Sequence, residues 1–292
     1  MTNQRPKTLG FIGLGQMGSH MAANILKGGG DLIVYDKAGS KERAPEGAKI
    51  SGNTSALAEA TDTIFISVPD GHASLSVINE IVAHRERRAK VIIDLSTIGP
   101  AAARQANAIC KKADITYIDA PVSGGQAGAK AGTITIMAAG ERATKETHDE
   151  IFFSFSRNLF YVGEEPGQGQ ALKILNNFLS GTAMAATTEA ILYGISQGLE
   201  MGTMLDVINV STGQNTATTD KFPTRILTET FNTGFATALL AKDIKLFFDN
   251  AQIAGTPIEV AEVISTRWAK TDQALPNSDI TLHYKLMRDG KL

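Results

Sequence analysis

Two polar side chains stand in an otherwise apolar helical stretch in the second half of the chain. Lys173 and Asn177 are four positions apart in "GQGQALKILNN" (residues 167–177). Residues four apart project from one face of a helix, so the ammonium and the amide would be neighbours. A lysine among apolar residues can serve as a general acid and base if desolvation lowers its pKa from about 10.4 toward neutrality. Taken alone, Lys173 is explained more simply as an aliphatic stem on apolar surface with its head group in water.

A glycine-rich segment near the start of the chain has the pattern of a phosphate-binding turn. Gly13-Leu14-Gly15-Gln16-Met17-Gly18 matches G-x-G-x-x-G, with a strand-like run before it and a helical pattern after it. In the dinucleotide-binding fingerprint the first glycine makes the turn, the second admits the pyrophosphate and the third lets helix and strand pack closely. The context predicts a bound dinucleotide, and the alternative is a tight turn that binds nothing.

An acid at the end of the next expected strand indicates which dinucleotide binds. Asp36 lies 18 residues after Gly18, close to the roughly 20 residues expected for a carboxylate that binds the ribose hydroxyls. Such a carboxylate repels a 2′-phosphate, so we predict NAD in preference to NADP. Lys37 and Lys41 leave NADP open, because a nearby cation can accommodate the extra phosphate.

A third segment has the residues of an anion-binding loop. In "DAPVSGGQAGAKAGT" (119–133), Ser123, Gly124 and Gly125 offer a hydroxyl and backbone N–H groups after a proline that fixes a turn. At the carboxyl end of a strand, such a loop can clamp a carboxylate. An ordinary turn would use the same residue types.

These candidates need a scaffold, and the first 164 residues predict one of alternating strands and helices. Near-continuous apolar strands separated by helical patterns indicate a doubly wound parallel sheet covered on both faces. The expected strands are 9–13, 31–36, 63–68, 90–96, 115–120, 133–140 and 158–163.

Strand patterns disappear from about residue 167. We expect a long connecting helix over 167–199, with Gly198 as its C-cap. The further expected helices are 202–210, 217–229, 235–253, 257–273 and 279–288. The predicted fold is therefore α/β, with a dinucleotide-binding Rossmann-type domain over residues 1–164 and an all-helical domain for substrate binding and dimerisation over residues 165–292.

Composition restricts the class of function. The 292 residues include 28 Lys and Arg against 30 Asp and Glu, and this net charge of −2 offers no basic footprint for nucleic acid. The single cysteine, Cys110, fits a reducing compartment. Neither a signal peptide nor a membrane span is evident, and the histidines lack metal-ligand spacing. We expect a cytoplasmic protein with a small-molecule ligand and without metal, nucleic-acid or membrane partners.

Four stretches together resemble the 3-hydroxyisobutyrate dehydrogenase family, also called the β-hydroxyacid dehydrogenases. In chain order they are "GFIGLGQMGSHMAANILKGG" (10–29), "DAPVSGG" (119–125), "GQGQALKILNN" (167–177) and "KDIKLFFD" (242–249). The resemblance covers nearly the whole chain. It implies hydride transfer between NAD or NADP and a small 3-hydroxy acid, or the matching semialdehyde, in a homodimer or homotetramer.

The resemblance also implies roles for individual residues. Lys173 matches the catalytic lysine, Asn177 the asparagine that orients substrate, and Ser123 the serine of the substrate loop. The implied substrate-binding residues are Ser123, Gly124, Gly125, Lys173, Asn177 and Lys242. The implied cofactor-binding residues are Gly13, Leu14, Gly15, Gln16, Met17, Gly18, Tyr35, Asp36, Lys37, Val68, Pro69, Ser96, Thr97 and Lys242.

Several other activities stay open at this point. A non-catalytic NAD-binding regulator would keep the glycine loop but would have no use for Lys173, Asn177 and Lys242 together. Imine reductases share the architecture but generally lack the lysine, and 6-phosphogluconate dehydrogenases are usually longer. Within the family, the alternatives are reductases of 2-hydroxy-3-oxopropionate or other semialdehydes, and dehydrogenases of threonate or 2-(hydroxymethyl)glutarate.

Overall fold

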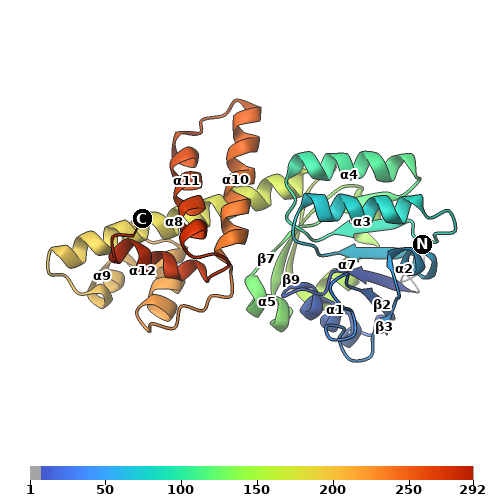
Figure 1. Cartoon of the computed structure of the whole chain (residues 1–292), viewed down its shortest axis with the longest axis horizontal. Helices are drawn as coiled ribbons and strands as arrows, with labels where there is room; N and C mark the ends of the chain where they lie inside the picture. Colours follow the sequence, from blue (N-terminus) through green and yellow to red (C-terminus); the bar gives the residue numbers. More distant parts are fainter. Residues whose placement is uncertain (1–7, 292) are drawn as a thin grey trace. The chain divides into compact units, whose positions relative to one another are not determined.

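A computed structural model of the chain describes residues 8–291 and divides it into two compact units. The first unit ends at Lys173 and the second begins at Ile174. Helix α8 (Gln168–Ser196) begins in the first unit and continues into the second as one unbroken helix (Figure 1). The domain boundary expected between residues 164 and 165 lies just before this helix.

The first unit is built on a nine-stranded sheet. Its largest part is parallel and has the order β3-β2-β1-β4-β5-β6, which is the doubly wound arrangement that the sequence predicts. The order reverses between β1 and β4, and in such sheets dinucleotides bind at the carboxyl ends of the strands beside this point. The strands are β1 (Leu9–Ile12), β2 (Leu32–Tyr35), β3 (Lys49–Ile50), β4 (Thr63–Ile66), β5 (Val91–Asp94) and β6 (Thr116–Asp119).

The rest of the sheet departs from the expected all-parallel arrangement. Strand β8 (Ile134–Ala139) runs antiparallel to β6 and to β7 (Val122–Ser123), while β9 (Ser156–Gly163) runs parallel to β8. Only residues 124–133 separate β7 from β8. A parallel crossover needs about a dozen residues or more, whereas an antiparallel return can be shorter.

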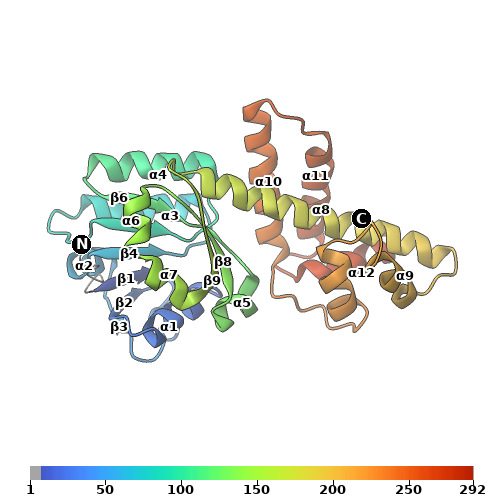
Figure 2. The same ribbon diagram turned by 180° about the vertical axis from the view of Figure 1, so that it is seen from behind.

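Helices cover both faces of this sheet, as Figure 2 shows from behind. Because side chains alternate along a strand, Phe11 and Phe65 join a cluster under one helical layer, while Ile12 and Ile64 join a second cluster under the other layer. The first layer contains α1 (Gly18–Lys27), α5 (Gly125–Ala131) and α7 (Asp149–Phe155), which follows the short α6 (Arg142–Glu146). The second contains α2 (Thr54–Ala60), α3 (Gly71–Ala83) and α4 (Pro100–Lys112).

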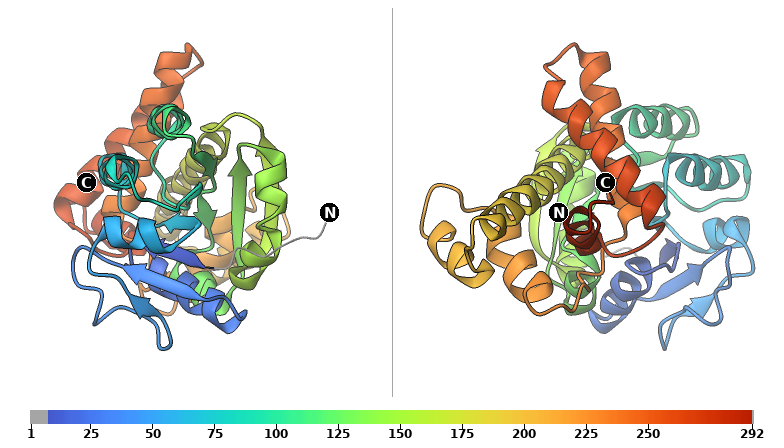
Figure 3. Two further views of the ribbon diagram at one scale, coloured as in Figure 1. Left: turned by 90° about the vertical axis from the view of Figure 1, so that its right-hand side faces the viewer. Right: turned by 60° about the vertical axis from the view of Figure 1, so that its left-hand side comes forward.

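The second unit consists of helices around a core that includes Phe222, Ile244 and Trp268. Helices α10 and α11 lie side by side, as their labels in Figures 1 and 2 show, and Figure 3 gives two further views of the chain. Gly198 adopts φ +80° just after α8, in keeping with the expected C-cap. No helix among residues 8–291, α8 included, is apolar enough over sufficient length to cross a membrane. The remaining elements are α9 (Met201–Ile208), η1 (Ala217–Ile226), α10 (Thr237–Ala254), α11 (Glu259–Ala274), η2 (Ile280–Leu282) and α12 (His283–Arg288).

One expected helix has an unexpected period. Residues 217–226 form a π-helix, and the Leu227 N–H donates to the Phe222 carbonyl, five residues back, at 2.8 Å. Pro223 lies inside this helix and cannot donate to a carbonyl four residues earlier. The sequence pattern locates the helix correctly but does not reveal the wider turn.

Candidate active site

The glycine loop joins β1 to α1, and its three glycines face different surroundings. Gly13 has φ +94°, and a Cβ there would lie 2.1 Å from the Ser67 carbonyl oxygen. A Cβ on Gly18 would lie 2.0 Å from the Gly13 carbonyl oxygen. A Cβ on Gly15, in contrast, would meet no heavy atom within 4 Å. Packing therefore requires glycine at 13 and 18, whereas Gly15 borders open space next to backbone N–H groups.

The start of α1 is suited to an anion. Its first turn contains no acidic side chain, and no side chain caps its N-terminus. The Ser19 N–H donates to the Gly15 carbonyl at 3.2 Å, and the positive end of the helix dipole favours an external anion beside the loop. Together with the open space at Gly15, this arrangement fits the pyrophosphate of a dinucleotide.

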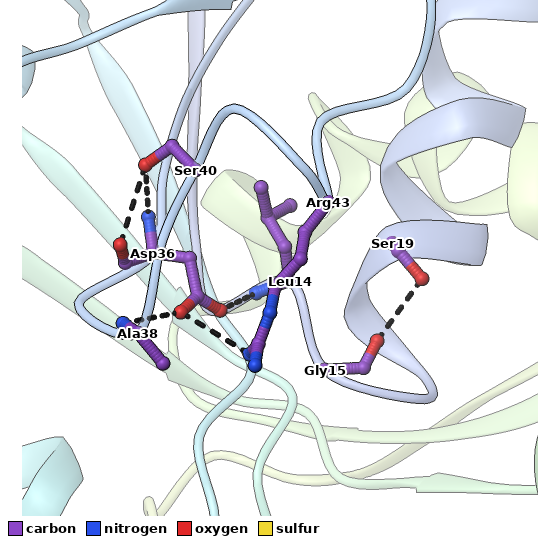
Figure 4. A network of polar contacts seen from close by, with 7 residues as sticks. All are labelled: Leu14, Gly15, Ser19, Asp36, Ala38, Ser40 and Arg43. Atoms are coloured by element: carbon purple, nitrogen blue, oxygen red, sulfur yellow. Dashed lines mark hydrogen bonds and ion pairs between the residues drawn. The ribbon is translucent and has the colours of Figure 1, made fainter.

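Asp36 follows β2 and contacts the glycine loop directly (Figure 4). Its Oδ2 accepts a hydrogen bond from the Leu14 N–H at 2.6 Å, and its Oδ1 accepts one from the Ala38 N–H at 2.7 Å. The side chain is only 9% exposed. The carboxylate is thus held beside the turn, where the fingerprint places its ribose-binding acid.

Arg43 is the cation that contacts this carboxylate, and sequence reasoning missed it. The Arg43 guanidinium lies 3.4 Å from Asp36 Oδ1. Lys37 and Lys41, which the sequence suggests as partners of a 2′-phosphate, have exposed side chains. Arg43 lies seven residues beyond Asp36 and reaches it because the intervening segment turns back, as Figure 4 shows.

The two other expected cofactor loops are joined to each other. They follow β4 and β5, which are neighbouring parallel strands, so both loops lie at the carboxyl edge of the sheet. The Val68 N–H donates to Ser96 Oγ at 2.9 Å, and the Ser96 N–H donates to Asp94 Oδ1 at 3.0 Å. Pro69 and Thr97, the other residues expected to bind cofactor here, directly follow Val68 and Ser96; Pro69 is exposed and Thr97 is partly exposed.

Two buried carboxylates support the same edge, and the sequence interpretation did not include them. Asp94 and Asp119 end β5 and β6, are paired in register, and are fully buried. Burial raises the pKa of Asp94, although hydrogen bonds from Ser74 and Ser96 oppose the shift. Burial raises the pKa of Asp119 to about 6 against hydrogen bonds from Gln170 and Gly167. The only sequence signal was an acid closing each of two apolar runs, "VIID" and "TYID".

The expected substrate loop forms a sharp turn in the first unit. Ser123 pairs with Thr135 across β7 and β8 and is partly exposed. Gly124 and Gly125 have φ of +133° and +64°, and a Cβ on Gly125 would meet nothing within 4 Å. These left-handed conformations favour glycine, so the motif is needed for the backbone path.

Lys173 is the last residue of the first unit, and its side chain is buried at 7% exposure. Only three positions separate it from Gln170, which is fully buried and bonded to the carboxyl edge of the sheet. The Lys173 side chain is therefore held one helical turn beyond a rigid part of α8. It does not lie at the surface, as the simpler interpretation expected.

Asn177 and Lys242 both belong to the second unit, where one acid connects them. The Asn177 amide donates to Asp243 Oδ2 at 2.6 Å, and Lys242 Nζ forms an ion pair with Asp243 Oδ1 at 3.2 Å. Asp243 is only 3% exposed. It follows Lys242 directly in "KDIK", but no local pattern pairs it with an asparagine 66 residues away.

One group among residues 8–291 has the ligand types of a metal site. Ligand atoms of Glu59, His84 and Glu86 lie within 4.8 Å of one another. Both glutamates are exposed. Exposed acidic groups of this kind are common without a metal, and the group carries no argument about activity.

Comparisons with known proteins agree with this geometry. Residues 8–163 match the family of the NAD-binding domain of 6-phosphogluconate dehydrogenase, and residues 167–287 match the NAD-binding domain of NADP-dependent 3-hydroxyisobutyrate dehydrogenase. A probable mitochondrial 3-hydroxyisobutyrate dehydrogenase of Dictyostelium discoideum is 34% identical over 88% of this chain and 83% of its own length. The chain belongs to the 3-hydroxyisobutyrate dehydrogenase family.

Further relatives extend this result. A 2-(hydroxymethyl)glutarate dehydrogenase of Eubacterium barkeri is 35% identical over 86% of this chain and 84% of its own length. The structure of 3-hydroxyisobutyrate dehydrogenase from Mycobacterium tuberculosis with L-serine has a TM-score of 0.88 at 26% identity and covers 97% of this chain and 99% of that chain. The predicted family, α/β fold class and NAD(P)-dependent hydroxy acid dehydrogenase activity are confirmed.

Proposed function

We propose that Lys173 is the general acid and base of hydride transfer between a nicotinamide cofactor and a small 3-hydroxy acid. The observation that carries this assignment is its burial, at 7% exposure, on the turn of α8 that follows the carboxyl edge of the sheet. Burial keeps this side chain out of bulk water beside the carboxyl edge of the sheet, where it can exchange a proton directly with a bound hydroxyl. In oxidation Lys173 would take the hydroxyl proton, and in reduction it would return it.

The cofactor, when bound, supplies the hydride chemistry at its nicotinamide ring, and the chain positions and holds the partners. We propose that Gly13–Gly18 hold the pyrophosphate and that Asp36, with Tyr35 and Lys37 on either side, holds the adenosine ribose. Val68, Pro69, Ser96 and Thr97 would line the nicotinamide and its ribose. The carboxylate of Asp36 favours NAD over NADP.

We propose that Ser123, Gly124 and Gly125 bind the substrate carboxylate. A carboxylate that accepts from these N–H groups and the hydroxyl forms charge-assisted hydrogen bonds, so the loop favours substrates with an acid group. Asn177 and Lys242 would bind substrate as well, with Lys242 also contacting cofactor. Asp243 is well placed to orient both, since it accepts from the Asn177 amide and pairs with the Lys242 ammonium.

The relatives narrow the substrate class. 3-Hydroxyisobutyrate, 2-(hydroxymethyl)glutarate and L-serine, named for the relatives, share a hydroxymethyl group on the carbon that bears the carboxylate. We propose that this chain acts on the same 3-hydroxypropanoate core, or on its semialdehyde, and that the substituent on C2 differs among substrates. A rate screen of acids that vary only at C2, with both cofactors, tests this.

Lys173→Ala is the decisive variant for the assignment. We expect kcat to fall by about 10²–10⁴-fold, the usual contribution of a general acid–base, with NADH affinity within about twofold of wild type. Lys245→Ala is the control, because Lys245 is an exposed lysine paired with Asp249 on α10. Wild-type turnover in Lys173→Ala, or equal losses in both variants, would show that another group moves the proton.

We propose further that the chain forms a homodimer or homotetramer through α8. Exposed apolar side chains follow this helix, including Leu175, Leu179 and Tyr193, which are 43%, 57% and 69% exposed. Large apolar side chains left on one helix are typical of an interface. Light scattering of Leu179→Glu should show a smaller species than wild type, and an unchanged mass would count against α8 as the interface.

We also propose a division into a cofactor domain (1–164) and a substrate domain (165–292), and a cytoplasmic location. The α/β organisation that precedes α8 supports the division into two domains.

The single cysteine, Cys110, which is buried, supports the cytoplasmic location. Fractionation of cells expressing the tagged protein tests the location, and recovery with an organelle would contradict it.

A further inference from the structure

The first turn of α8 is tied to the cofactor-facing edge of the sheet by one fully buried amide. Gln170 Oε1 accepts hydrogen bonds from the Ile98 N–H at 2.8 Å and the Gly99 N–H at 3.1 Å. Its Nε2 donates to the Ser96 carbonyl at 3.0 Å and to Asp119 Oδ1 at 2.6 Å. Every hydrogen-bonding position of the amide is therefore used, and Gln170 itself is 0% exposed.

Asp119 holds the same turn from a second direction. Its Oδ2 accepts from the Gly167 N–H at 2.8 Å and the Gln170 N–H at 3.1 Å, two donors at the start of α8. A Cβ on Gly169 would lie 2.4 Å from the Met137 carbonyl oxygen and 3.0 Å from Asp119 Oδ2. Glycine at this position lets the helix approach the ends of β6 and β8 closely enough for these bonds to form.

The network continues into the loops that the proposed function assigns to the cofactor. Ser96, whose carbonyl accepts from Gln170, also accepts at Oγ from the Val68 N–H. The loops after β4 and β5, the end of β6 and the first turn of α8 are thus linked in one chain of hydrogen bonds, which are buried except for the partly buried bond between Val68 and Ser96. A buried polar network that is fully satisfied rigidifies its surroundings, because any displacement leaves a polar group unpaired.

We propose that Gln170 and Asp119 are positioning residues that fix the Lys173 side chain relative to the cofactor loops. Lys173 follows Gln170 by three residues, so it lies one turn farther along the same rigid helix. Neither Gln170 nor Asp119 needs to touch the reacting atoms. The inference rests on the proposed role of Lys173, and it names the residues that give this role its geometry.

The experiment is a polarity exchange at the contact between the two side chains. Gln170→Glu sets two carboxyl groups against each other, and Asp119→Asn sets two amide NH₂ groups against each other or against the N–H donors of α8. In the double variant the asparagine amide can donate to the glutamate carboxylate while its oxygen still accepts from the helix N–H groups. The double variant restores the contact between the two side chains with reversed polarity and the same total charge. The glutamate cannot donate to the Ser96 carbonyl as Gln170 does, so the recovery is partial.

We expect each single variant to lower kcat by about 10–100-fold with the Kd for NADH unchanged within about twofold, since a misplacement near 1 Å can cost about 10²-fold. The double variant should recover at least about fivefold in kcat over either single variant, a coupling typical of side chains in contact. Hydrogen exchange should quicken in peptides 94–100 and 164–178 of the single variants and slow again in the double variant.

Thr63→Val is the matched control for a merely structural effect. It removes another buried hydrogen bond of the first unit, between Thr63 Oγ1 and His148 Nε2 at 2.9 Å, at the start of β4 and so at the opposite edge of the sheet. We expect this variant to lose thermal stability but to keep wild-type kcat.

Three results would overturn the proposal. They are wild-type kcat in both single variants, losses in kcat that are matched by equal losses in NADH affinity, or a double variant no better than the singles. Hydrogen exchange needs no turnover, so it tests the coupling even if the role of Lys173 proves wrong. Conversely, active Lys173→Ala with the expected exchange pattern would reject only the proton-transfer role.

Discussion

Asp36→Asn should change which dinucleotide the protein accepts. The asparagine keeps the shape and one acceptor for the Leu14 or Ala38 N–H, both of which Asp36 binds now. It removes the negative charge that repels a 2′-phosphate. We therefore expect the ratio of kcat/KM for NADP to kcat/KM for NAD to rise. One of the two N–H groups loses its acceptor, which should cost about 1–3 kcal/mol of fold stability.

The size of the change follows from two opposing effects on a 2′-phosphate, which are repulsion by Asp36 and attraction to Arg43. Two unit charges about 4 Å apart interact by about 4 kcal/mol at an effective dielectric constant near 20. Arg43, 3.4 Å from Asp36 with a side chain 42% exposed, already offsets part of that repulsion and is itself screened by solvent. A net change of about 2 kcal/mol is left, or about 30-fold in the ratio.

The assay compares steady-state rates with both cofactors on one 3-hydroxy acid. Arg43→Ala should lower the ratio in the Asp36→Asn background, because the freed guanidinium is then the main group that binds the phosphate. Lys41→Ala is the control, since Lys41 is exposed and shares the segment. A ratio unchanged by Asp36→Asn would show that Asp36 does not face the adenosine ribose, and equal effects of Arg43→Ala and Lys41→Ala would show only a general charge effect.

Two more predictions separate binding from stability. Gly15→Ala should weaken NADH binding by about tenfold or more at unchanged Tm, because its methyl enters the open space beside the N–H groups. Gly18→Ala should instead lower Tm by several degrees, because its Cβ would lie 2.0 Å from the Gly13 carbonyl oxygen. An unchanged Kd in Gly15→Ala would argue against the pyrophosphate site. Burial, with a smaller contribution from Arg267, lowers the pKa of His283 from 6.5 to about 4. As the pH falls, the unfolded chain therefore protonates His283 before the folded chain does, and this favours unfolding. The free energy of unfolding is fully retained above pH 6.5 and falls by about 3 kcal/mol between pH 6.5 and 4. His283→Gln should flatten the dependence of Tm on pH in that window, and an identical slope would contradict the assignment.

Local sequence patterns were sufficient for most of the fold. Apolar runs bounded by glycine and polar residues located seven strands, and the 3.6-residue period located α8 and the helices after it. The two-residue strands β3 and β7 were missed, because so short a pairing leaves no periodic signal. The antiparallel direction of β8 depends on a short connection and on neighbours brought by folding, which periodicity does not encode.

The candidate site divides in the same way. Gly13–Gly18 and Asp36 became candidates because local spacing carries their chemistry, whereas Lys173 became one through the resemblance of its segment to the family. Arg43 and Gln170 did not, because their significance lies in partners that folding brings close. Gln170 and Asp119 are 51 residues apart, and nothing in either segment indicates the other. Sequence thus identified the groups proposed to react, and the structure adds those that hold them.

The central claim is most directly tested by the structure of the complex with NAD and a slow or unreactive 3-hydroxy acid. The account predicts Nζ of Lys173 within about 3.2 Å of the substrate hydroxyl oxygen, the reach that proton transfer requires. A hydroxyl oxygen that lies more than about two hydrogen-bond lengths from Nζ, beside another proton acceptor, would contradict it.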